Sequence, residues 1–385
     1  MQILKNFIIS FNFLIFLFFL LFLLIEYTKL FERIYFPDNY DDRAKKAYLL
    51  QGFSEEYYED IKKESGSVNQ TNYEDYFYVT PQIIEQEYVN ITDYYNSRKV
   101  KFISKINESK LKIWMFGGST MLELGVEDQY TIASSLAKNF KQNNQKVFIA
   151  NFGMNGFNTT LERIKFLELL HKVEPEEIPN EVIFYHGLND VTYSHLYNSP
   201  YVMPHYMSKG LKIIVNQDHK GLIFYGLERY FWKSAAVLSG FKKYLENIFL
   251  ENTFLEDTKV ENTPVSNLSV FNRAVKYYLN NEKMINSICL EYKIKCHFIL
   301  QPSLVTKKNP TEAEATLTSG LGEDFIDWHL KFYDLVKNSS KNYLFYDLTY
   351  AFDESEESID YSDWIHLAPL SSQYIGNKIY NAVYK

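Results

Sequence analysis

The sequence predicts an α/β fold with a parallel sheet, because short apolar runs alternate with amphipathic stretches through its carboxyl-terminal part. The runs predicted as strands are residues 112–116, 147–152, 181–185, 296–300 and 343–348. The stretches predicted as helices are residues 131–140, 160–171, 272–291, 324–336 and 369–380. Five strands with helices between them are typical of a flavodoxin-like three-layer sandwich. The alternation breaks between about residues 191 and 270, which predicts a helical insertion over the carboxyl edge of the sheet.

The chain begins with an apolar run that is long enough to cross a bilayer as a helix. From residue 7 to residue 25 only Ser10 and Asn12 are polar, and no A-x-A-like cleavage site follows. We therefore expect an uncleaved single-pass anchor over residues 1–26. Positive charges flank the run on both sides, so the positive-inside rule does not decide the orientation of the anchor in the membrane. Because only a few residues precede the anchor, we expect the main domain outside the cytoplasm.

A polar, Tyr-rich region over residues 27–110 follows the anchor. It contains short candidate helices and no apolar run suited to a central strand, so we expect a juxtamembrane stalk or collar. The main domain is then expected over residues 111–385, with the insertion at about residues 191–270.

The first predicted strand runs into a turn that looks suited to a nucleophile. Residues 113–116 are all apolar, are too few for a helix and show no clear alternation, which predicts a strand buried on both faces. Gly117 and Gly118 follow, and glycine allows the backbone angles of a sharp bend. Ser119 would then stand at the carboxyl end of a central strand, where open α/β sheets collect their ligands.

The helices are predicted from the spacing of apolar side chains. In residues 160–171, for example, Leu161, Ile164 and Leu170 share one side of the expected helix. With 385 residues, of which 46% are hydrophobic, the chain is long enough to bury a sizeable core.

The net charge of the chain excludes one class of binding partner. The formal net charge of -8 offers no basic surface to a phosphate backbone, so nucleic acid is not expected as a partner.

Cys289 and Cys296 are the only cysteines and show no metal-ligand spacing. Two buried free thiols are the default expectation, and export of the domain would allow them to pair. No metal and no cofactor are expected.

Polar or glycine-bearing turns follow each of the first three strands. In a parallel sheet these turns lie side by side on one edge, and a loop before the last helix brings an Asp and a His to the same edge. The segments are Gly117-Gly118-Ser119-Thr120, Asn151-Phe152-Gly153-Met154-Asn155-Gly156, His186-Gly187-Leu188-Asn189-Asp190 and Asp363-Trp364-Ile365-His366.

These residue types fit nucleophilic catalysis. A serine hydroxyl needs a neighbouring base to take its proton, and a histidine base works best when a carboxylate fixes its tautomer. Ser119, His366 and Asp363 supply those three roles. The tetrahedral oxyanion needs donors placed in advance, and the expected donors are the backbone N–H groups of Ser119 and Gly153 and the side-chain amide of Asn189.

The four segments resemble the conserved blocks of the SGNH hydrolases, the GDSL-type esterase and lipase superfamily. Ser119 matches the first block, Gly153 the second, Asn189 in G-x-N-D the third, and Asp363-x-x-His366 the last. One departure is Gly118, where the family's name-giving motif has Asp; a GGS form resembles membrane-anchored bacterial members. Gln301-Pro302-Ser303 after the fourth strand also resembles that subgroup.

Each assignment has a structural alternative. Ser119 or Asp363 would serve as a helix cap, Asn189-Asp190 as a turn, and His366 as a hydrogen-bonded structural histidine. His186 is a rival base because it adjoins Asn189. His195 and His205 lie in the insertion and are expected at the surface or in a substrate cleft.

The resemblance implies a serine esterase that acts on an ester-linked acyl group through an acyl-enzyme. The expected membrane anchor adds the hypothesis of an acetyl group on a cell-envelope glycan as the substrate. Carbohydrate, lipid and small esters all fit such a site. An O-acyltransferase would use the same Ser-His-Asp site, because only the group that attacks the acyl-enzyme differs. A catalytically silent glycan-binding or scaffold protein is the alternative from another class. The acyl group, the acceptor and the oligomeric state stay open.

Overall fold

The computed structural model describes residues 41–68, 70–74, 78–196, 267–318, 321–340, 344–353 and 360–385. Apart from Asp41, these residues belong to one compact unit formed by Asp42–Met207 and Val265–Lys385. The predicted anchor and the predicted helix within the insertion lie outside the described residues. Within the described ranges no helix is long and apolar enough to span a membrane.

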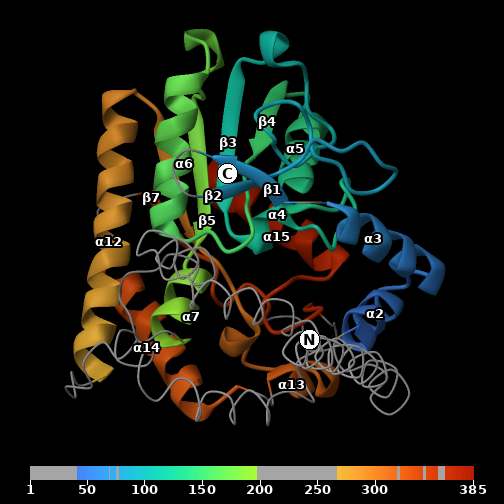
Figure 1. Ribbon diagram of the computed structural model, residues 1–385, viewed down its shortest axis with the longest axis vertical. Coiled ribbons are helices and arrows are strands. Elements are labelled where there is room, and N and C mark those ends of the chain that lie inside the picture. The colour runs from blue at the N-terminus through green and yellow to red at the C-terminus, as the bar shows by residue number, and fades with distance from the viewer. Residues whose placement is uncertain are drawn as a thin grey trace, which may run out of the picture. The chain divides into compact units, whose positions relative to one another are not determined.

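A five-stranded parallel sheet forms the centre of this unit, as the alternation of strands and helices predicted (Figure 1). Its order is β4-β3-β5-β6-β7, which is the flavodoxin-like order. The strands are β3 Leu111–Gly117, β4 Val147–Asn151, β5 Glu181–His186, β6 Lys295–Leu300 and β7 Leu344–Asp347. Each lies within two residues of its predicted bounds.

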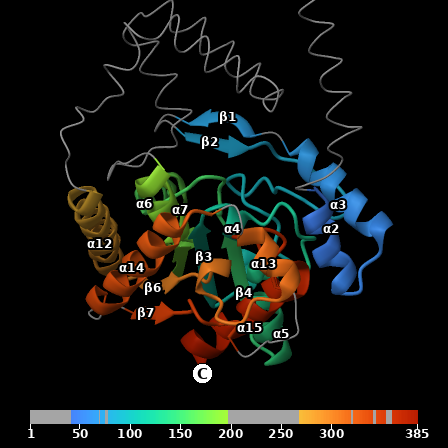
Figure 2. The same ribbon diagram turned by 90° about the horizontal axis from the view of Figure 1, so that it is seen from below.

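Two helical layers cover the sheet because successive side chains of each strand point to opposite faces. Ile113 and Met115 of β3 pack in the cluster that contains α5 Ile132–Gln142 and α15 Pro369–Tyr384. Trp114 and Phe116 pack in the cluster on the other face, with α6 Thr159–Lys172 and α12 Asn267–Glu291. Figure 2 shows the two pairs of helices on opposite sides of the sheet. The prediction of a three-layer α/β/α arrangement is therefore confirmed.

Four further helices of the described part of the chain follow β3. They are α4 Ser119–Leu122, α7 Leu188–Leu196, α13 Glu312–Thr318 and α14 Glu323–Ser339, with short 3-10 turns η1 Ile106–Glu108, η2 Pro175–Glu177 and η3 Leu304–Thr306. The predicted insertion falls between α7 and α12, and its residues 197–266 lie outside the described residues.

The region before β3 packs against the sheet domain. It holds α2 Asp41–Leu50, α3 Glu55–Ser67 and an antiparallel hairpin of β1 Gln70–Glu74 and β2 Tyr78–Pro81. Farther along, the Arg98 N–H donates to Asn151 O at the end of β4 (2.9 Å), and the Ser104 N–H donates to Val147 O (2.8 Å). The boundary predicted at residue 110 stays a prediction.

A buried ion pair fastens this region to the loop that follows α4. The Arg98 guanidinium contacts the Asp128 carboxylate, and both side chains are fully buried. Arg98 also donates to Val126 O (2.7 Å), while Asp128 accepts from the backbone and side chain of Asn90. The region before β3 thus contributes a buried charged group to the contacts of the loop that follows α4.

Cys289 at the end of α12 and Cys296 in β6 form a disulfide. The default expectation of two free thiols was therefore wrong. Lys293 has a positive φ of 56° and the Ile294 N–H donates to Cys289 O (2.8 Å), so the chain reverses within a few residues. This tight reversal brings the two Cα atoms to 6.2 Å, within the range that a disulfide needs.

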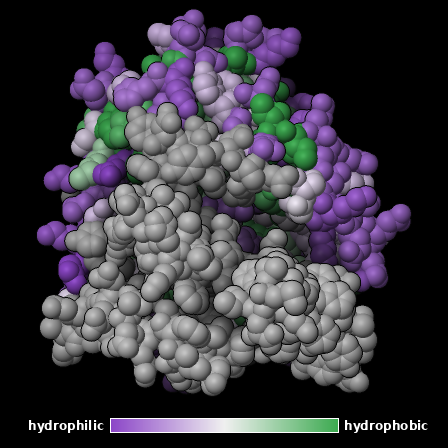
Figure 3. Space-filling view, viewed as in Figure 1, coloured by the Kyte–Doolittle hydropathy of each residue, from purple (hydrophilic) through white to green (hydrophobic). Residues whose placement is uncertain are grey.

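The surface is mostly hydrophilic where Figure 3 draws described residues, with separate hydrophobic spots. Exposed apolar side chains such as Leu50 and Leu290 lie on different helices. Such scattered exposure is normal for a globular domain.

Candidate active site

Gly117 and Gly118 lead from β3 directly into α4, which begins at Ser119. Gly118 has a φ of -81°, so the glycine pair is not required by a positive φ, as the sharp-bend argument had implied. Close packing requires it instead: a Cβ on Gly117 would lie 2.5 Å from Tyr185 O, and one on Gly118 would lie 2.5 Å from Asn189 Nδ2. The neighbouring turns therefore approach each other closely only because both residues lack a side chain.

The structure brings Ser119, His366 and Asp363 together. Ser119 Oγ lies 2.8 Å from His366 Nε2, although the two residues are 247 positions apart in the chain. His366 Nδ1 lies 2.6 Å from Asp363 Oδ2. These distances are those of hydrogen bonds, so a continuous chain of contacts joins the carboxylate, the imidazole and the hydroxyl.

The loop before α15 holds the imidazole through both oxygens of Asp363. Asp363 Oδ1 accepts from the backbone N–H groups of Ile365 (2.7 Å) and His366 (2.6 Å), which leaves Oδ2 for the ring. An ionised Asp363 places the ring proton on Nδ1 and leaves Nε2 to accept the serine proton. The side chain of Asp363 is 11% exposed and that of His366 is 35% exposed, so the base can meet a substrate from solvent.

The three predicted oxyanion donors have different surroundings. No hydrogen-bond partner among the described residues is found for the N–H of Ser119, the first residue of α4. One amide N–H of Asn189 donates to Phe157 O (2.6 Å), which fixes the carboxamide. The second N–H of the same amide is the one predicted to bind the oxyanion. The Gly153 N–H, in contrast, donates to Asn151 Oδ1 (2.9 Å). The oxyanion role of these three groups stays a prediction, and only Gly153 has its N–H already bonded.

Asn151 is a supporting residue that the sequence alone did not single out. Its side chain is buried at the end of β4, and its Nδ2 donates to Met121 O in α4 (2.8 Å). A Cβ on Gly153 would lie 2.4 Å from Leu122 N. Asn151 and Gly153 therefore fix the second turn against the nucleophile helix, and the polar residue ending an apolar strand was the available signal.

Gly118→Ala is expected to lower kcat for ester hydrolysis by about 10²- to 10³-fold, because the new Cβ would displace the Asn189 amide, and losing one oxyanion donor costs that much. Gly125→Ala is the matched control, since a Cβ there meets no atom within 4 Å. Steady-state kinetics on both variants test this. Equal kcat values for the two variants would show that the Asn189 amide is not a donor to the transition state.

His186, the rival base, is buried in a different set of contacts. Its Nδ1 lies 2.8 Å from Glu162 Oε2 and its Nε2 lies 3.4 Å from Glu282 Oε1. Burial alone would lower the pKa of His186, but the two carboxylates outweigh it and raise the pKa to about 10. The ring nitrogens thus face two carboxylates and not Ser119, so His186 links α6 and α12 in place of acting as the base for Ser119.

This network predicts a loss of stability at alkaline pH. The pKa of His186 is higher in the folded state than its ordinary value of 6.5, so its stabilisation is full below pH 6.5 and is lost as the pH rises through about 10. One proton gives a slope of at most about 1.4 kcal/mol per pH unit. Urea unfolding at a series of pH values from 6.5 to 10 measures how the unfolding free energy depends on pH. In Glu282→Gln the steepest loss should move to lower pH; an unchanged profile would contradict the assignment.

His195 and His205, two histidines of the predicted insertion, differ in what the structure describes. His195 in α7 lies with its Nε2 3.2 Å from Asp324 Oδ2, and its ring packs edge-on against Phe325 and Trp328. The side chain of His195 is 22% exposed and that of Asp324 is 81% exposed. His205 lies outside the described residues. In the described ranges no group of three or more His, Cys, Asp or Glu side chains could hold a metal ion.

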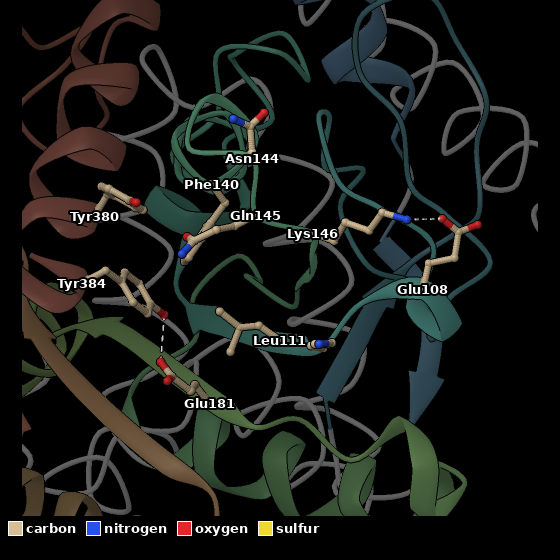
Figure 4. Close-up of a pocket in the computed structure, with 10 residues that line it drawn as sticks. Glu108, Leu111, Phe140, Asn144, Gln145, Lys146, Glu181, Tyr380 and Tyr384 are labelled. Carbon is tan, nitrogen blue, oxygen red and sulfur yellow. Dashed lines mark hydrogen bonds and ion pairs between the residues drawn. The ribbon is translucent and has the colours of Figure 1, made fainter.

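A cavity of 540 Å³ lies at the amino edge of the sheet, where β3 and β5 begin (Figure 4). Leu111 and Glu181 line it from the strands, and Phe140, Tyr380 and Tyr384 line it from α5 and α15. Tyr384 donates to Glu181 Oε2 (2.9 Å), as the dashed line in Figure 4 marks. The triad lies at the carboxyl edge, so this cavity is separate from it.

No family model and no curated protein matches the sequence. Among solved structures, the chain is similar to the acetyl xylan esterase AlAXEase, with 13% identity, a TM-score of 0.38, and coverage of 71% of this chain and 100% of that one. It is similar to Axe2, an acetylxylan esterase from Geobacillus stearothermophilus, with 10% identity, a TM-score of 0.38, and coverage of 72% and 95%. A third is the lipase Lip_vut3 from a goat rumen metagenome, with 13% identity, a TM-score of 0.40, and coverage of 71% and 98%.

Proposed function

We propose that this protein is an SGNH-type ester hydrolase that works through an acyl-enzyme on Ser119. The single observation that carries the proposal is the chain of contacts from Asp363 through His366 to Ser119, with distances of 2.6 Å and 2.8 Å. Its position at the carboxyl edge of a parallel sheet, open to solvent at His366, suits substrate binding. The residues also occur in the order of the family's blocks.

The first half of the reaction forms the acyl-enzyme. Ser119 Oγ attacks the ester carbonyl carbon while His366 Nε2 takes the hydroxyl proton, and Asp363 stabilises the resulting imidazolium. In this proposal the Ser119 N–H and the second N–H of the Asn189 amide bind the oxyanion. The tetrahedral intermediate then collapses, and the alcohol leaves with the proton from His366. In the second half water, activated by His366, attacks the acyl carbon and releases the acid and Ser119.

The proposed substrate is an acetyl ester on a cell-envelope glycan, and the proposed location is the extracytoplasmic face of a membrane. The apolar run of residues 7–25 supports an anchor. The bond between Cys289 and Cys296 supports an oxidising compartment, because structural disulfides are rare in the cytosol. If a sugar hydroxyl replaced water in the second half, the same site would transfer the acyl group.

Hydrolysis of p-nitrophenyl acetate and p-nitrophenyl butyrate by the full chain in detergent tests the proposal and ranks the acyl lengths. We expect acetate to be the better substrate and activity to disappear in Ser119→Ala. An acetylated oligosaccharide, with acetate release and sugar products both measured, separates hydrolysis from transfer. A well-folded wild type that neither hydrolyses these esters nor transfers their acyl group would favour the silent glycan binder.

A further inference from the structure

The segment Gln301–Lys307, which we call the brace, follows β6 and contacts both parts of the catalytic constellation. It begins with the Gln301-Pro302-Ser303 sequence and contains η3. Neither the nucleophile turn nor the loop with Asp363 and His366 belongs to the brace.

The amino end of the brace holds the residue next to the nucleophile. Thr120 Oγ1 donates to Gln301 Oε1 (2.9 Å), and both residues are buried, with exposures of 7% and 2%. The Gln301 N–H donates to His186 O (3.2 Å), so the backbone of Gln301 continues the pairing of β6 with β5. The four-residue helix α4 is therefore tied to the sheet at Thr120, one residue after Ser119.

The carboxyl end of the brace holds the loop that carries His366. The Leu304 N–H donates to Trp364 O (3.1 Å), between Asp363 and His366. Lys307 Nζ donates to Asp360 Oδ2 (2.7 Å) and to Glu314 Oε2 (2.7 Å), and all three side chains are buried.

Asp360 in turn closes the base of this loop. Its carbonyl oxygen accepts from the Ala368 N–H (3.0 Å), and the Ser362 N–H donates to His366 O (2.9 Å). Within the brace, Ser303 and Thr306 form a reciprocal capping box, which keeps η3 in one conformation. A short, internally bonded segment thus links Thr120 at one end to Asp360 at the other.

We propose that the brace sets the distance between Ser119 Oγ and His366 Nε2, with Gln301 and Lys307 as positioning residues that act through Thr120 and Asp360. The inference rests on the proposed esterase function. Its physical basis is that nucleophile and base come from distant parts of the chain, and a misplacement of about 1 Å can cost about 10²-fold in rate. Neither positioning residue is proposed to touch the substrate.

Thr120→Val tests the amino end, because valine keeps the shape of threonine and removes only the hydroxyl. We expect kcat per active site to fall about 10- to 100-fold with KM within about two-fold, and Thr120→Ser to restore kcat. Burst titration of active sites removes any effect of a smaller folded fraction. Gln301→Met should match Thr120→Val, and the double variant should lose little more, since both remove one interaction.

Lys307→Met tests the carboxyl end of the brace, because it removes the charge that pairs with Asp360 and Glu314. Lys307→Arg is the matched variant that keeps this charge. Lys331→Met is the control, because Lys331 forms an exposed ion pair with Asp327 (2.6 Å). We expect Lys307→Met to lower both stability and kcat per titrated site, Lys307→Arg to recover part of kcat, and the control to change neither. Should Lys307→Met fail to fold, the Thr120 and Gln301 variants decide alone.

Unchanged kcat per active site in Thr120→Val and Gln301→Met would overturn the inference, as would strictly additive losses in the double variant. An inactive wild type would instead be a failure of the proposed function. The two failures are therefore distinguishable in one set of assays.

Discussion

Ser119→Ala is expected to lower kcat for p-nitrophenyl acetate hydrolysis by about 10⁴- to 10⁶-fold, with folding unchanged. Ser119 Oγ is the atom that lies 2.8 Å from His366 Nε2, and its loss removes the covalent route. Ser287→Ala is the matched control, because Ser287 is exposed on α12 and its hydroxyl donates to Lys283 O within the same helix (2.9 Å). Steady-state kinetics with circular dichroism check the prediction.

The three residues should also behave as one unit. His366→Ala alone should cost nearly as much as Ser119→Ala, and the double variant should be little worse than either, because the base has no role without the nucleophile. Asp363→Asn should cost about 10⁴-fold by allowing the wrong ring tautomer. Losses that multiplied across the double variant would contradict a shared role.

Arg98→Ala is expected to cost about 3–5 kcal/mol of unfolding free energy, the largest stability effect that we predict. The substitution leaves the Asp128 carboxylate buried without the guanidinium, and removing one partner of a buried ion pair has that cost. Lys331→Ala, which breaks an exposed pair, should cost no more than about 1 kcal/mol. Urea unfolding of both variants measures the difference.

The same argument applies to truncation. A fragment that starts at residue 111 lacks Arg98 and the backbone pairing of Arg98 with Asn151, so it should unfold at lower urea than the full chain. Equal stability of Arg98→Ala and wild type would mean that the collar is not part of the fold that supports Ser119.

The sheet and the contacts among Ser119, Asp363 and His366 were predictable because local signals agreed with the global fold. Ile113 to Phe116 form an apolar run of strand length, and Ser119 and His366 sit at strand and helix ends that parallel topology brings to one edge. The residue types at those ends then suggested the chemistry.

Other features depended on long-range packing that no local pattern carries. The two carboxylates around His186 come from α6 and α12, and nothing near His186 in the sequence indicates Glu162 or Glu282. The guanidinium of Arg98 lies in a polar stretch that looked like a stalk. Gly118 illustrates the same limit: its glycine suggested a bend, whereas the structure shows that it makes room for Asn189.

Covalent labelling with a fluorophosphonate, followed by peptide mapping, tests the central claim most directly. Such a reagent reacts with a serine only when a base activates it and donors bind the developing oxyanion. We predict one label per full-length chain, on Ser119, with loss of labelling in Ser119→Ala and strong slowing in His366→Ala. A folded wild type that stays unlabelled, or carries the label on another residue, would contradict the assignment of Ser119 as nucleophile.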